Sequence, residues 1–128
     1  MRAIYIILML LMLVFIGVQY NDPDGAQWMV IYAIPSIWLA IAAFRHSWLV
    51  AGIIRMCLLI CILLSVAGVA YYWPDSEGWW RQKVWWEVES VREGMGMMII
   101  SVVLFIVWLG RPRLQNINDS VGSTELER

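Results

Sequence analysis

The chain has 128 residues, of which 62% are hydrophobic and only 15% are charged, and its formal net charge is −1. A typical soluble domain is nearer half apolar and a quarter charged, so this composition excludes an ordinary soluble fold and indicates helices that contact lipid on most sides. The lack of net positive charge argues against nucleic acid as a partner.

Four apolar segments are each long enough to cross a membrane, which takes about 20 helical residues for roughly 30 Å of hydrocarbon. None alternates with the period of two that a lipid-facing barrel strand requires, whereas a helix satisfies its own backbone hydrogen bonds. We therefore predict an all-α integral membrane protein, a four-transmembrane-helix antiparallel bundle within residues 1–113. Because the connections are short, consecutive spans should be antiparallel neighbours. The predicted spans are about 3–20, 26–44, 50–73 and 84–110.

The basic residues near the ends of the spans predict the orientation of the bundle. If four spans alternate, five arginines fall on one side: Arg2, Arg45, Arg55, Arg111 and Arg113. By the positive-inside rule this side is cytoplasmic, so both termini should face the cytoplasm from the plasma (inner) membrane. The polar segment 114–128 is predicted to be a disordered cytoplasmic tail. The lipid bilayer is the expected partner, and other membrane subunits or a second copy of the chain remain open.

A first candidate motif, Tyr20-Asn21-Asp22-Pro23-Asp24-Gly25, joins the first two spans. Pro23 cannot continue the first helix, so either Asp22 or Asp24 is expected to cap the second one. If Asp24 is the cap, Gln27 completes a capping-box pattern. Either way two carboxylates stand at a helix N-terminus, where the helix dipole favours negative charge. Capping alone is thus a sufficient structural explanation for them.

A second candidate motif lies at the start of the fourth span. At 100° per residue, Glu89, Arg92 and Glu93 share one helix face, and Trp85 and Gly96 fall on the same arc. These charges lie near the hydrocarbon boundary, where they are costly unless they are paired or face a wet cavity.

Both motifs should open on the outer face, where a shared site would hold Asp22, Asp24, Glu89 and Glu93, with Arg92 among them. Three interpretations follow. Arg92 could tie the fourth helix to the first turn in a structural ion-pair cluster. The four carboxylates could instead bind a hard cation through oxygen. Repulsion could also keep one carboxyl protonated for proton transfer.

Each of these three interpretations of the cluster corresponds to a predicted function. The leading one is a non-enzymatic membrane protein that binds a cation or a small polar ligand at this cluster. An accessory or scaffold subunit with a purely structural cluster is the alternative, and an intramembrane enzyme is the third. No nucleophile–base pair is readable, so no catalytic residue is assigned. There is no haem signal, since the only histidine, His46, lies outside the spans, and there is no nucleotide signal.

The two motifs also carry a resemblance. Val18-Gln19-Tyr20-Asn21-Asp22-Pro23-Asp24, followed by Trp28, Tyr32 and Pro35, resembles the first signature of the transmembrane protein 220 family. Glu89 with Arg92-Glu93 and a nearby glycine resembles its second signature. The resemblance implies a small multispan helical fold and supplies no activity. The candidate ligand-binding residues are Tyr20, Asn21, Asp22, Asp24, Trp28, Tyr32, Trp85, Glu89, Arg92 and Glu93, and the candidate metal ligands are Asp22, Asp24, Glu89 and Glu93.

Overall fold

The fold consists of four long helices joined by short helical turns. The computed structural model describes residues 1–73, 78, 80–112, 122 and 125, with the backbone alone at 85 and 86. The predicted tail, 114–128, therefore lies outside the described residues except at two positions. In chain order the elements are α1 (Arg2–Val18), the 3-10 helix η1 (Gln19–Asn21), α2 (Gly25–Phe44), the 3-10 helix η2 (His46–Val50), α3 (Gly52–Tyr71), α4 (Gln82–Glu87) and α5 (Glu89–Leu109).

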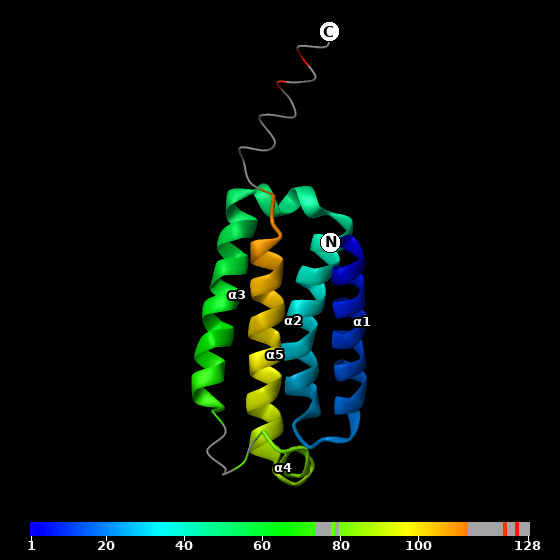
Figure 1. Ribbon diagram of the computed structural model, residues 1–128, viewed down its shortest axis with the longest axis vertical. Coiled ribbons are helices and arrows are strands. Elements are labelled where there is room, and N and C mark those ends of the chain that lie inside the picture. The colour runs from blue at the N-terminus through cyan, green and yellow to red at the C-terminus, as the bar shows by residue number, and fades with distance from the viewer. Residues whose placement is uncertain (74–77, 79, 113–121, 123–124, 126–128) are drawn as a thin grey trace.

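Helices α1, α2, α3 and α5 are each long and apolar enough to cross a membrane. Figure 1 shows them running alternately up and down, with the start of α1, η2 and the end of α5 at one end of the bundle and η1 and α4 at the other. Large apolar side chains on α1 and α3, such as Ile7, Leu10 and Leu63, are exposed on the outside. Such a surface suits a lipid solvent, and the predicted four-helix membrane bundle is confirmed.

The order in which the helices pack differs from the expectation that consecutive spans are neighbours. Helix α1 packs along α2, and α3 packs along α5, while α2 and α3 make little contact with each other. In Figure 1, α5 lies between α2 and α3, and η2 crosses the end of the bundle to connect those two helices. There, His46 Nε2 donates a hydrogen bond to the Gly110 carbonyl oxygen at 2.8 Å, which ties η2 to the end of α5.

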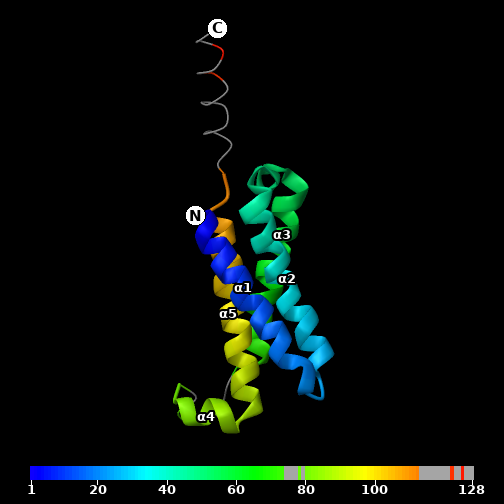
Figure 2. The same ribbon diagram turned by 90° about the vertical axis from the view of Figure 1, so that its right-hand side faces the viewer.

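The fourth span begins later than the sequence indicates. Val88 has an extended backbone (φ −115°, ψ 111°) that separates the short helix α4 from α5. Figure 2 shows α4 directed away from the axis of α5 rather than continuing it. The prediction of one helix from residue 84 is therefore wrong. Polar Gln82 and charged Lys83 and Glu87 lie on α4, which is outside the candidate span Glu89–Leu109.

Aromatic side chains fill the bundle core near η1. Trp28 and Tyr32 on α2 are buried, with exposed fractions of 3% and 6%. The Tyr32 ring packs against Phe15 of α1 at a centroid distance of 5.5 Å, and the Trp28 ring packs against Tyr72, after α3, at 5.4 Å. Because each ring packs against other aromatic rings on two sides, Trp28 and Tyr32 are held rigidly at this end of the bundle.

Candidate functional site

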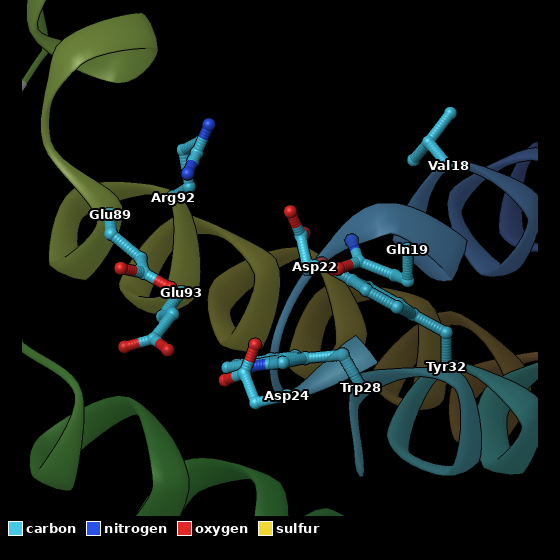
Figure 3. A pocket seen from close by; sticks show the side chains of 9 residues that line it. All are labelled: Val18, Gln19, Asp22, Asp24, Trp28, Tyr32, Glu89, Arg92 and Glu93. Atoms are coloured by element: carbon cyan, nitrogen blue, oxygen red, sulfur yellow. The ribbon is translucent and has the colours of Figure 1, made fainter. Parts of the chain in front are cut away.

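A cavity of about 270 Å³ opens at the end of the bundle that carries η1 and the start of α5. Four chain segments contribute to its wall: the end of α1 with η1, the turn before α2, the first two turns of α2, and the first turns of α5. Figure 3 shows the nine side chains. They are Val18, Gln19, Asp22, Asp24, Trp28, Tyr32, Glu89, Arg92 and Glu93. We call this space the outer cavity.

Three carboxylates meet in the wall of the outer cavity, one from the N-cap of α2 and two from the start of α5. Asp24, Glu89 and Glu93 each present one oxygen, and these oxygens all lie within 4.8 Å of one another. Asp24 and Glu93 are partly buried, whereas Glu89 is exposed. We call these three residues the carboxylate triad. Asp22 lines the same cavity but is not part of this close group.

Asp24 is positioned for the cavity rather than for capping. It occupies the N-cap position of α2, yet its side chain makes no capping hydrogen bond. Its Oδ2 instead accepts a hydrogen bond from Trp28 Nε1 at 2.9 Å. Gln27 does not complete the predicted capping box either, since its Nε2 donates to the Tyr72 hydroxyl at 3.4 Å. Capping therefore does not account for this carboxylate.

Tyr32 brings a hydroxyl to the cavity wall. A Cβ atom placed on Gly96 would overlap that hydroxyl, so the phenol lies directly against the α5 backbone. Only the absence of a side chain at Gly96 permits this approach. Tyr32 is more than nine-tenths buried, yet its hydroxyl forms no hydrogen bond within the described part of the chain. The hydroxyl oxygen is not among the fully buried polar atoms that lack a partner, so it is open to the cavity and can reach water or a ligand there.

Arg92 lines the cavity without neutralising its carboxylates. Its side chain is exposed, and among residues 1–73 and 80–112 it forms no ion pair. Figure 3 shows the guanidinium directed away from Glu89 and Glu93. The contacts that a structural cluster tied together by Arg92 would need are therefore absent from the described residues.

The outer cavity brings together seven of the ten predicted site residues. Tyr20 is 74% exposed and Asn21 is also exposed, and neither lines the cavity. The side chain of Trp85 lies outside the described residues. Sequence reasoning missed Val18 and Gln19 as site residues, although both stand in the first signature. A tight 3-10 turn at η1 puts Gln19, and not Tyr20, on the cavity side.

Four apolar spans packed around a buried hydrophobic core define this chain as a multi-pass helical membrane protein. The particular family follows from comparison with known proteins. The model of the family described as Transmembrane family 220, helix, matches residues 4–109, so the chain belongs to this family. Comparison with curated proteins and with solved structures gave no match.

Proposed function

We propose that this membrane protein is a binding protein whose outer cavity takes a cation. The observation that carries the proposal is the carboxylate triad: Asp24, Glu89 and Glu93 converge within 4.8 Å at the end of a membrane span. Three carboxylates held that close repel one another, and their arrangement gains stability once a positive charge lies between them.

Two further observations support binding over a structural or catalytic role. Arg92 does not supply the compensating charge to the triad in the described structure. Among the described residues, the cavity lining has no serine, cysteine, histidine or lysine that an adjacent carboxylate could activate as a nucleophile or base. A scaffold subunit remains the alternative, and it predicts a cluster that does not respond to a particular cation.

Thermal unfolding of the purified protein in detergent tests this proposal. One cation among Ca²⁺, Mg²⁺, Mn²⁺ and organic ammonium ions should raise Tm saturably, because a ligand of the folded state contributes about 2.7 kcal/mol at a hundredfold excess over Kd. Glu89→Gln should abolish that shift, whereas Glu87→Gln on α4, outside the cavity, should retain it. A Tm that follows ionic strength alone, in both variants and the parent, would reject the proposal in favour of the scaffold.

We further propose that the outer cavity faces away from the cytoplasm, with both termini inside. In a background with the free Cys57 and Cys61 changed to alanine, single cysteines are placed at Asn21 and Ser47, which are exposed at opposite ends of the bundle. A membrane-impermeant maleimide should label Asn21→Cys on intact cells and Ser47→Cys only after permeabilisation. The reverse pattern would show that the orientation is inverted.

A further inference from the structure

We infer that the ligand of the outer cavity is a primary ammonium that also carries a phosphate, the chemistry of a phosphoethanolamine group. This inference rests on the proposed cation-binding function and specifies its ligand. Its physical basis is that the walls of one cavity offer partners for each part of such a molecule: three carboxylates, two aromatic rings, a hydroxyl without a partner, and a guanidinium without a partner among the described residues.

The triad matches the hydrogen-bonding geometry of a primary ammonium. An –NH₃⁺ group has three donors in tetrahedral directions. With charge-assisted N···O distances of roughly 2.7–2.9 Å, its three acceptors would stand roughly 4.4–4.7 Å apart. The oxygens of Asp24, Glu89 and Glu93 lie within 4.8 Å of one another, so one nitrogen could contact all three. A calcium ion, with oxygen ligands at roughly 2.3–2.6 Å, would also fit this spacing. The choice between an ammonium and a calcium ion therefore depends on the other residues that line the cavity.

The size and the aromatic walls of the cavity favour an organic cation over a metal ion. One water takes roughly 30 Å³ in the liquid, so a volume of about 270 Å³ has room for several atoms beyond a single ion. Trp28 and Tyr32 offer no oxygen ligand through their rings. The same rings attract an ammonium and pack well against its methylene groups. A small organic cation would contact these aromatic rings, whereas a hard metal ion would leave them in contact with water.

Two polar groups point to an anionic part in the same ligand. Arg92 lines the cavity as its only lining cation and forms no ion pair among the described residues. Its planar guanidinium is suited to bidentate contact with phosphate. The hydroxyl of Tyr32, which opens onto the cavity, can donate a hydrogen bond. A phosphate on the ammonium-bearing molecule would give these groups the partners that they lack.

The position of the cavity leaves two sources for this chemistry. The triad lies at the start of the last candidate span and close to the end of the first one, and a bilayer crossed by these spans would have its headgroups at that level. The ligand is therefore either the headgroup of phosphatidylethanolamine or a free phosphoethanolamine compound. Both present the same ammonium and phosphate, and a binding experiment can separate them.

Titration calorimetry on the purified protein in detergent tests the ligand class. O-phosphoethanolamine should bind saturably. Phosphocholine, whose quaternary nitrogen has no N–H donor, should bind at least tenfold more weakly, as should inorganic phosphate and ethanolamine, which each lack one charged part. Equal binding of phosphocholine would overturn the assignment to a primary ammonium. Binding or stabilisation by Ca²⁺ with no response to O-phosphoethanolamine would reject this inference while leaving the proposed function intact, and no response to any cation would reject both.

Three variants assign the parts of the ligand to the walls. Glu89→Gln should weaken O-phosphoethanolamine and ethanolamine alike, because it removes an ammonium partner. Arg92→Gln should weaken O-phosphoethanolamine roughly tenfold or more but should not weaken ethanolamine. Tyr32→Phe should weaken O-phosphoethanolamine while leaving the rings in place. Glu87→Gln is the matched control and should change nothing. If Arg92→Gln binds O-phosphoethanolamine as tightly as the parent, the phosphate assignment fails.

Lipid nanodiscs distinguish the source. If the lipid headgroup is the ligand, the protein should have a higher Tm in phosphatidylethanolamine than in phosphatidylcholine discs, and Glu89→Gln should remove most of that difference. In that case added O-phosphoethanolamine should stabilise the protein only in phosphatidylcholine. If the free compound is the ligand, it should stabilise the protein equally in both. If neither the lipid composition nor added O-phosphoethanolamine changes Tm in either kind of disc, the inference is overturned.

Discussion

Replacing Gly96 with alanine is expected to destabilise the protein by about 1–3 kcal/mol, the usual cost of overpacking a well-packed interior. The added methyl group would overlap the hydroxyl of Tyr32. That ring cannot move away easily, since Phe15 and Trp28 pack against it. The measurement is reversible denaturation in mixed detergent or thermal unfolding, and binding at the outer cavity should weaken with it.

Two further variants identify the clash as the cause. Tyr32→Phe combined with Gly96→Ala removes the overlapping oxygen and should recover much of the lost stability, while Tyr32→Phe alone should have a small effect. Gly68→Ala is the matched control, because its new methyl group would meet the end of the flexible Met97 side chain instead. It should change stability by less than about 1 kcal/mol. Similar losses for both glycines would contradict the explanation.

Neutralising Glu93 should have the opposite effect on stability. The triad holds its negative charges within 4.8 Å, and at that separation each like-charged pair costs from about 1 kcal/mol in water to about 3 at an effective dielectric constant of 20. In the absence of ligand, Glu93→Gln should therefore raise Tm at neutral pH. The same variant should lose the stabilisation by cations, which is the trade-off expected at a binding site.

Acidic pH provides the check on this second prediction. Carboxylates in general take up protons as the pH falls, which weakens repulsion between like charges, so the advantage of Glu93→Gln should shrink. Glu87→Gln, outside the triad, should show neither the gain at neutral pH nor its loss at acidic pH. If Glu93→Gln were instead destabilising without ligand at neutral pH, its carboxylate would hold a structural role in the bundle, and the scaffold interpretation would gain support.

Much of the site could be predicted because few elements reach the end of a four-helix bundle. The 100° rule correctly places Glu89, Arg92 and Glu93 on one face, and alternating spans bring that face to the same end as Asp24. Val91, on the opposite arc, is fully buried as its apolar character predicts. Charge spacing and topology are sufficient for these residues.

Other features depend on contacts that no local pattern contains. Nothing in the sequence marks a helix break at Val88, since no glycine or proline stands there, yet the chain changes direction at that residue. The short connection after α2 limits the distance between the end of α2 and the start of α3, but it does not determine which helix packs beside α2. The bond from Trp28 to Asp24 replaces the expected cap because the indole lies one turn away and needs a buried acceptor.

The position of α5 between α2 and α3 has a consequence for biogenesis. In chain order α5 is the last of the four spans, and α2 and α3 have little contact with which to hold each other. The final span must therefore insert into a partly open assembly and join its two halves. It also delivers Glu89 and Glu93, so two of the three triad carboxylates are added only when that last insertion is complete.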